Sequence, residues 1–293
     1  MRVIIFSKNR AAQAELLLRS IKELVVDWRD WFITVFYHGD NDAFEDSYKI
    51  LKSIHPEFHY HHEDDEKSLK EQICNLISME KKTFFSFFVD DLVVIRPFSI
   101  HDRQFNLLKE NRTGEVLALS LRLNPHISYC QPLNLQTHPC RIKNDGTFEY
   151  KKGAFEYYLE QNVCSRLLRK FGLKVFMPIA GDWATQMNLD GNVFRFADFK
   201  EYFSTLDEFR SVVQIEPLML SKPLPGKTIV IYPKSRVINI ASNRVRGGDS
   251  FPCREENPMT INDKFLNGGR LTYEHLRNID NHCCHIAATL KFR

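Results

Sequence analysis

The sequence predicts an α/β protein built on a mostly parallel central sheet that is flanked by helices. Two observations carry this prediction. Short apolar strands alternate three times with amphipathic helices in the first half of the chain, and the segment Thr83–Val89 is rich in aromatic residues. Repeated strand–helix units are typical of parallel sheets. An apolar run of this kind is typical of a strand that helices cover on both faces.

The first half of the chain supplies these strands and helices in order. We predict strands, each an apolar or β-branched run, at residues 3–7, 32–37, 58–60 and 83–89. The segments between them repeat apolar residues at helical spacing, as Leu17 and Ile21 do in the first. Asp40 or Asn41 is suited to cap the second helix. The third helix is predicted within Glu66–Met79.

The second half is less regular and forms the elaborated C-terminal part of the expected fold. Its predicted strands are Glu115–Leu123, Val175–Ile179, Val193–Phe196 and one or two within 227–240. Apolar residues at helical spacing predict a helix over Lys152–Phe171. Residues 124–146 contain three prolines and little pattern, which predicts a long loop. Because no repeat or linker divides the 293 residues, we expect a single domain.

Composition and charge exclude several classes of protein. The 40 Lys and Arg residues nearly balance the 37 Asp and Glu residues, unlike the strong basic excess of a dedicated nucleic-acid-binding protein. No apolar run approaches the roughly 20 residues that span a bilayer. The seven cysteines form no CxxC pair, which argues against a disulfide framework or a zinc ribbon. We therefore expect a cytoplasmic protein without a nucleic-acid partner or a transmembrane segment, and a peripheral membrane contact stays open.

Two adjacent carboxylates, Asp90 and Asp91, end the apolar strand. Unpaired charges are costly in a core, so these side chains must emerge at the carboxyl edge of the sheet or be neutralised. Ligands bind at that edge of parallel α/β sheets, and carboxylates suit Mg²⁺ or Mn²⁺, which hold phosphate oxygens. Because neighbouring strand residues point to opposite faces, the pattern allows only one of the two to touch the metal. The alternative is an acid that caps the following turn.

The first predicted strand ends in Ser7-Lys8-Asn9-Arg10, where a helix begins. Backbone N–H groups and a basic side chain at such a point form an anion site. A plain helix cap with a solvated arginine is the alternative. Asp40 ends the second strand, so we expect it at the same sheet edge as Ser7 and Asp90.

A further pair of acids follows a predicted strand in the second half. Asp182 stands beside Trp183, and Asp190 lies eight residues later. A carboxylate next to an aromatic ring suits a general base beside a sugar, although a helix cap and a core tryptophan give the same pattern. Seven basic residues between 222 and 254 are suited to a diphosphate, or form a solvated surface.

The histidine clusters are weaker signals of a metal site. His59, His61 and His62 precede an acidic run but show no recognisable ligand spacing, and neither does the segment 282–285. We retain His285 as a single late ligand to a metal that is held elsewhere.

Taken together, these segments resemble those of GT-A-fold glycosyltransferases that use a nucleotide-diphosphate sugar, and in particular a group of bacterial glycosyltransferase-like proteins. The resemblance is carried by Ile5–Arg10, Phe88–Asp91, Ala118–Asn124, Gly181–Arg195 and Ile238–Val245. It extends over nearly the whole chain. It implies a nucleotide-sugar-binding half, residues 1–123, and an acceptor-side and C-terminal part, residues 124–293.

The resemblance also implies roles for single residues. Asp90 and Asp91 stand where the family has its metal- and diphosphate-binding acids. The expected nucleotide pocket consists of Ser7, Asn9, Arg10, Asp40 and Asp90. Three positions depart from the family pattern: the acid pair is adjacent rather than D-x-D, Asn192 replaces a histidine, and Asn124 replaces a glycine.

The implied reaction is transfer of a sugar from a nucleotide-diphosphate donor to an acceptor hydroxyl, in glycan or polysaccharide synthesis. The expected partners are that donor, a divalent cation and a glycan or other hydroxyl acceptor. If the enzyme inverts, a carboxylate must take the acceptor proton. Asp182 is the first candidate for this base and Asp190 the second, and the sequence leaves the stereochemistry open. The alternative function is a non-catalytic nucleotide- or glycan-binding module of the same fold.

Overall fold

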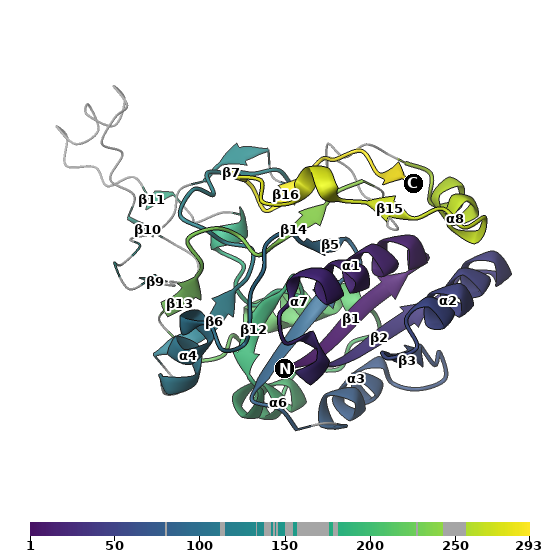
Figure 1. Ribbon diagram of the computed structural model, residues 1–293. Helices are drawn as coiled ribbons and strands as arrows, with labels where there is room; N and C mark the ends of the chain where they lie inside the picture. The colour runs from purple at the N-terminus through teal and green to yellow at the C-terminus, as the bar shows by residue number, and fades with distance from the viewer. Residues whose placement is uncertain are drawn as a thin grey trace.

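The protein was analysed as a computed structural model of the 293-residue chain (Figure 1). The structure describes residues 1–79, 81–111, 115–132, 134–137, 142, 144, 146–149, 155–156, 176–177, 181–226, 228–242 and 256–293.

The strands form one large sheet and several small ones. The large sheet contains β1 (Arg2–Lys8), β2 (Phe32–His38), β3 (His59–His62), β4 (Phe84–Val89), β6 (Val116–Ser120), β9 (Thr147–Glu149), β12 (Asn192–Arg195) and β13 (Thr228–Ile231). The other strands are β5 (Leu92–Val94), β7 (Tyr129–Cys130), β8 (Leu135–Gln136), β10 (Phe155–Glu156), β11 (Phe176–Met177), β14 (Val237–Ile240), β15 (Leu271–Thr272), β16 (His285–Ile286) and β17 (Lys291–Phe292). The helices are α1 (Ala11–Leu24), α2 (Asp42–Ile54), α3 (Leu69–Ser78), α4 (Arg103–Glu110), α6 (Phe196–Ser204), α7 (Val212–Ser221), α8 (Pro258–Leu266) and the 3₁₀ turns η1 (Trp28–Asp30), η2 (Gly181–Trp183) and η3 (Glu274–Leu276).

The large sheet has the strand order β3-β2-β1-β4-β12-β6-β13-β9. The first four strands are all parallel, and β6 is parallel to β13. Strand β12 lies antiparallel between β4 and β6, and β9 is antiparallel to β13 at the edge. The α/β fold with a mostly parallel central sheet flanked by helices is therefore confirmed.

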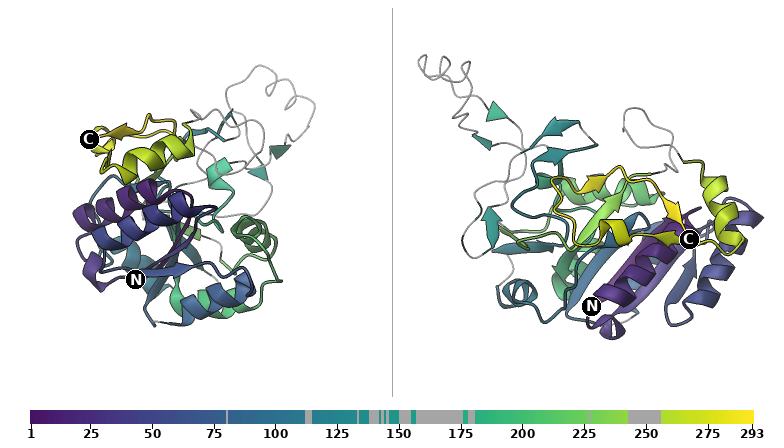
Figure 2. Two further views of the ribbon diagram at one scale, coloured as in Figure 1. Left: turned by 90° about the vertical axis from the view of Figure 1, so that its right-hand side faces the viewer. Right: turned by 45° about the horizontal axis from the view of Figure 1, so that its top comes forward.

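Alternate residues of the central strands build a core on each face of the sheet. Val3 and Ile5 of β1 join the core under α1, α2, α4 and α8. Ile4 and Phe6 join the core under α3, α6 and α7. Figure 1 shows α1 and α2 side by side, and Figure 2 shows the C-terminal elements gathered above them. This double covering explains why β4 is apolar at almost every position.

A small sheet of β16, β14 and β5 brings the C-terminal part to the carboxyl edge of β4. Strand β5 begins at Leu92, directly after the acid pair, and pairs antiparallel with β14, so that Leu92 lies opposite Asn239. Strand β16 pairs with the other side of β14, which places His285 beside Asn239. Segments about 150 residues apart therefore meet next to Asp91.

The four strands and three helices predicted for the first half are all present, and the predicted ends differ from the observed ones by at most three residues. In the second half, the predicted strand 115–123 ends at Ser120, and Gly181–Trp183 is a 3₁₀ turn. The region 227–240 forms two strands. The predicted helix Lys152–Phe171 lies almost wholly outside the described residues, as does most of Val175–Ile179.

In the described part of the chain, no helix combines the length and the apolar character needed to cross a bilayer.

Candidate active site

The carboxyl ends of β1, β2 and β4 open on a cavity of about 890 Å³. Parallel strands place these ends at one edge, where the chain turns into helices or loops and leaves polar groups exposed. Its wall includes Ser7, Arg10, Asp90, Asp91, Asp190 and His285, which come from both halves of the chain. Six of the nine predicted catalytic, nucleotide-binding and metal-binding residues therefore line one cavity.

Arg10 lines this cavity beside the acid pair. Its Nη1 is 3.0 Å from Oδ1 of Asp90 and 3.7 Å from Oδ2 of Asp91. The other oxygen of Asp90 accepts a hydrogen bond from the backbone N–H of Lys8, at 3.3 Å. Burial raises the pKa of the Asp90 carboxyl, and the Arg10 guanidinium opposes that rise. One cation is thus shared by two acids.

Asp91 is the more accessible member of the pair. Its side chain is 25% exposed, against 6% for that of Asp90. Burial and the carboxylates of Asp90 and Asp190 raise the pKa of Asp91, while Arg10 and the Asn239 amide lower it. Both oxygens of Asp90 accept hydrogen bonds, whereas Oδ2 of Asp91 has only the longer 3.7 Å contact with Arg10 and is the oxygen better placed to meet a molecule in the cavity.

The expected nucleotide residues fall into two groups. Ser7 and Arg10 line the cavity, and Ser7 Oγ lies 2.7 Å from the Tyr48 hydroxyl. Asn9 and Asp40 instead bond to each other outside the cavity wall, with Asn9 Nδ2 donating to Asp40 Oδ2 at 2.7 Å. Asn9 has a φ of 58°, in the left-handed region. Of the five residues predicted for the nucleotide pocket, Ser7, Arg10 and Asp90 therefore line the cavity, while Asn9 and Asp40 do not.

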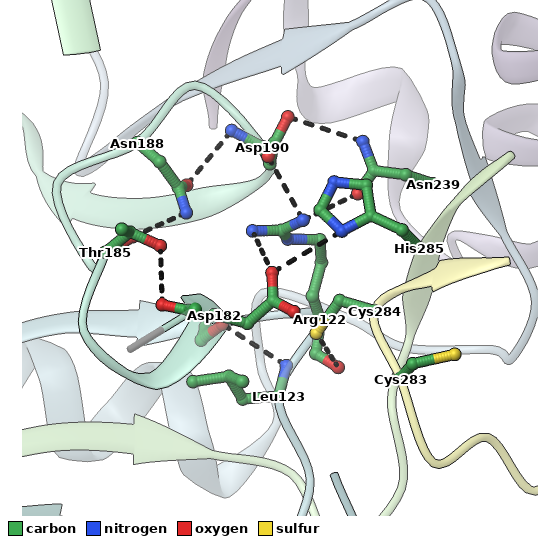
Figure 3. A network of polar contacts seen from close by, with 12 residues as sticks. Arg122, Leu123, Asp182, Thr185, Asn188, Asp190, Asn239, Cys283, Cys284 and His285 are labelled. Atoms are coloured by element: carbon green, nitrogen blue, oxygen red, sulfur yellow. Dashed lines mark hydrogen bonds and ion pairs between the residues drawn. The ribbon is translucent and has the colours of Figure 1, made fainter. Parts of the chain in front are cut away.

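A buried arginine, Arg122, connects the two candidate bases (Figure 3). Its Nη1 is 3.1 Å from Oδ2 of Asp190, and its Nη2 is 3.5 Å from Oδ1 of Asp182. Burial opposes ionisation of Arg122, but the carboxylates, Asp190 foremost, raise the pKa of its guanidinium. Arg122 follows β6 in a mostly apolar stretch and is itself buried, so its charge must be paired inside the protein.

The two acids differ in their access to the cavity. Asp190 lines it, with a side chain that is 17% exposed. Asp182 is 5% exposed and does not line the cavity. Its Oδ1 is 3.5 Å from Nη2 of Arg122 and 3.6 Å from Nδ1 of His285. Only Asp190 is therefore in direct reach of a molecule in the cavity.

Asn239 joins the Asp91 and Asp190 sides of the site. Its Nδ2 donates to Asp91 Oδ1 at 2.9 Å and lies 3.4 Å from Asp190 Oδ1, while its Oδ1 accepts from Arg122 Nη1 at 2.7 Å. Neither Asn239 nor Arg122 was assigned a role from the sequence. A charged residue inside the mostly apolar run 116–123 is a signal that could have identified Arg122, whereas nothing in the sequence marked Asn239 as its partner.

The predicted metal ligands are only partly brought together. Asp90, Asp91 and His285 line the same cavity. Within the described residues, however, no three His, Cys, Asp or Glu side chains are grouped as a metal site. Any cation here would rely on few protein ligands.

The basic stretch 222–254 does not face the cavity in its described part. Lys222 pairs with Asp207, Lys234 pairs with Asp280, and Arg236 stacks on Tyr232. None of the three lines the cavity wall. The other four basic residues lie outside the described ranges.

Neither a protein-family model nor a protein of curated function matches the sequence. Among solved structures, TarS residues 1–349 from S. aureus has a TM-score of 0.44 and 11% identity over 81% of this chain. The chain spans 60% of that structure. The same protein in complex with UDP-GlcNAc gives a TM-score of 0.42 and 11% identity, over 91% of this chain and 65% of that one. HddC from Yersinia pseudotuberculosis gives 0.41 and 9%, over 90% and 99% of the two chains. At these values no residue role is transferred.

Proposed function

We propose that this chain is a glycosyltransferase that moves a hexosyl or related sugar from a nucleoside-diphosphate donor to an acceptor hydroxyl. Glycans are the acceptors with which this activity is tested most directly. The proposal rests on one observation, that two different sets of polar side chains line the same cavity. Arg10 and Asp91 stand at the carboxyl edge of the parallel strands, and Asp190 faces the same cavity from the other half of the chain. One wall is suited to a diphosphate and the other to proton transfer.

The donor diphosphate is expected beside Arg10. Its guanidinium can donate to phosphate oxygens while it stays anchored to Asp90. Helix α1 begins at the next residue, so its first N–H groups add positive potential at this end of the cavity. Arg10 would bind and orient the donor and stabilise the charge that develops on the leaving diphosphate.

The charge of the cavity supports a cation that arrives with the donor. Acidic side chains in the wall outnumber lysines and arginines: Glu63, Asp65, Asp90, Asp91, Asp190 and Glu216 stand against Lys8, Arg10 and Arg210. A bare diphosphate would meet net repulsion there. Mg²⁺ is commonly held by one or two carboxylates and by substrate phosphates. Asp91 fits such a limited role, since its carboxylate is the more accessible of the pair.

The metal prediction is therefore kept in a reduced form. Asp91 would hold Mg²⁺ or Mn²⁺ together with the donor, and Asp90 would act mainly through Arg10. When bound, the cation would neutralise charge on the leaving group. His285 stays a second candidate because it shares the cavity wall.

Asp190 is the base that the geometry favours for an inverting reaction. The acceptor oxygen would bond to the anomeric carbon, and the bond from that carbon to the diphosphate oxygen would break with its electron pair. The acceptor proton would pass to Asp190. Asp182, the first candidate from the sequence, would act from behind through Arg122, because its carboxylate is buried.

A donor screen tests the proposal. Thermal shifts with UDP- and GDP-sugars, with and without Mn²⁺, identify a donor, and release of nucleoside diphosphate then reports transfer or hydrolysis. Release that depends on Asp190 would support the enzyme. Binding without any release, across a panel of glycan acceptors, would favour the alternative of a non-catalytic nucleotide- or glycan-binding module. A cytoplasmic location stays part of the proposal and rests on cysteine usage.

A further inference from the structure

Asn239 occupies the junction between the two acidic parts of the cavity. It lies in β14, is 2% exposed, and still forms part of the cavity wall. Its register opposite Leu92 on one side and beside His285 on the other fixes its backbone in the middle of the small sheet. A polar side chain in such a buried position must find its partners within the protein.

The three partners of Asn239 use both ends of its amide. The Nδ2 group donates to Asp91 Oδ1 at 2.9 Å and to Asp190 Oδ1 at 3.4 Å. The Oδ1 accepts from Arg122 at 2.7 Å. An amide has two N–H donors and a carbonyl acceptor, which is what this environment requires. An aspartate would add a third carboxylate, and an alanine would leave three polar groups without this partner.

We propose that Asn239 is a positioning residue that links Asp91, at the sugar-donor end of the cavity, to the base Asp190. Its two N–H groups hold one oxygen of each carboxylate, and Arg122, which it also binds, holds the other oxygen of Asp190. Asp190 is thereby fixed at a set distance from the donor end of the cavity. The inference rests on the proposed function, because it assigns Asn239 to that reaction.

This arrangement predicts a specific kinetic effect when the Asn239 amide is lost. Misplacing a catalytic group by about 1 Å costs up to about 10²-fold in rate. Loss of the amide should therefore lower kcat more than it raises the KM for the donor. Substitution of a residue with a merely structural role would instead lower the amount of folded enzyme, without lowering kcat more than it raises KM.

Two variants and a control test this predicted change in kcat and KM. Asn239→Ala and Asn239→Asp should each lower kcat by about 10-fold or more, with the donor KM changed by less than about 3-fold. The control is Asn281→Ala, which removes another buried amide, one that donates to Ser235 Oγ and Cys283 O at 3.0 Å outside the cavity wall. Asn281→Ala should lose stability while keeping kcat. Unchanged kcat in folded Asn239→Ala would overturn the inference.

A second readout does not depend on turnover or on any variant being active. The side-chain amide resonances of Asn239, identified by their loss in Asn239→Asp, should shift when Mg²⁺ and UDP are added to the wild-type protein. Resonances that stay in place while UDP binds would overturn the positioning role. If the wild-type protein binds no nucleoside diphosphate at all, the proposed function itself fails, and the inference fails with it.

Discussion

Nη1 of Arg10 lies 3.0 Å from Oδ1 of Asp90, and both side chains are almost buried. Arg10 supplies the counter-charge that a carboxylate needs at the buried end of an almost wholly apolar strand. It also sets the chemistry of the cavity. A guanidinium anchored on one acid is held ready to meet an anion without moving.

Removal of the Arg10 side chain should have two separable effects. Arg10→Ala should weaken binding of UDP or GDP by about 1–3 kcal/mol, the scale of a charged hydrogen bond. It should also destabilise the fold by about 3–5 kcal/mol, since Asp90 loses its buried partner. Calorimetric titration and thermal melting measure the two quantities.

The double variant Arg10→Ala/Asp90→Ala separates these effects. It removes both charges, so it should recover much of the lost stability while nucleotide binding stays weak. Equal nucleotide affinity in wild type and Arg10→Ala would place Arg10 outside the donor site.

Asp91 should lower the stability of the protein at neutral pH. Burial raises its pKa in the folded state, so the folded protein holds this proton more tightly than the unfolded chain does. Stability must then fall as the pH rises from the ordinary aspartate range through the raised pKa. Asp91→Asn lacks this loss, and its Tm should exceed that of wild type at pH 7 by about 2 °C or more.

The pH dependence of this difference identifies its cause. The Tm advantage of Asp91→Asn should shrink as the pH falls and Asp91 becomes protonated in both states. Asp46→Asn on the exposed face of α2 is the control and should change Tm little. An advantage that is constant from pH 3 to pH 8 would contradict the assignment to Asp91 ionisation. If Asp91 also binds the cation, the variant should lose the stabilisation that Mn²⁺ with UDP gives wild type.

Gly181 should be intolerant of a side chain. Its φ of 73° lies in the left-handed region, and an added Cβ would stand 2.6 Å from the Cβ of Cys130. Gly181→Ala should therefore cost roughly 2–4 kcal/mol of stability, from backbone strain and overpacking together. Gly268 has a φ of 90° with nothing within 4 Å of its added Cβ, so Gly268→Ala should cost only about 1 kcal/mol. Chemical denaturation of both variants checks the difference, and equal losses would contradict the contact with Cys130.

The sheet and its functional edge could be predicted because they depend on local pattern. Periodicity identified β1 to β4, and the rule that parallel strands share a carboxyl edge brought Ser7, Arg10 and Asp90 together. The same rule could not say which side chains at that edge face the cavity. Asn9 turns through a left-handed backbone conformation and bonds to Asp40 instead.

The Arg122 network could not be predicted, because its partners meet through strand register rather than sequence spacing. Strands β5, β14 and β16 are two to four residues long, too short for a periodic signal. Their pairing alone places Asn239 next to Asp91 and beside His285. The order of the two candidate bases changes for the same reason, since only the fold shows that Asp182 lies behind Arg122.

Asp190 and Asp182 should respond differently to the same isosteric change. Asp190→Asn should lower turnover by about 10²–10⁴-fold, the usual contribution of a general base, while donor binding is preserved. Arg122 and Asn239 hold the carboxylate of Asp190, which lines the cavity and stays accessible from it. Sugar transfer and donor affinity, measured on the same preparation, test this expectation.

Asp182→Asn should act mainly on stability. Its carboxylate is buried against Arg122 and His285, and the loss of one of the two acids that face Arg122 leaves that buried cation less well neutralised. We expect a lower Tm and at most about a 10-fold loss of turnover, because Asp190 still holds Arg122 at 3.1 Å. The two accounts diverge when both variants are compared at a temperature where each is folded. Abolished transfer in Asp182→Asn together with an active Asp190→Asn enzyme would return the role of base to Asp182, acting through a rearranged His285.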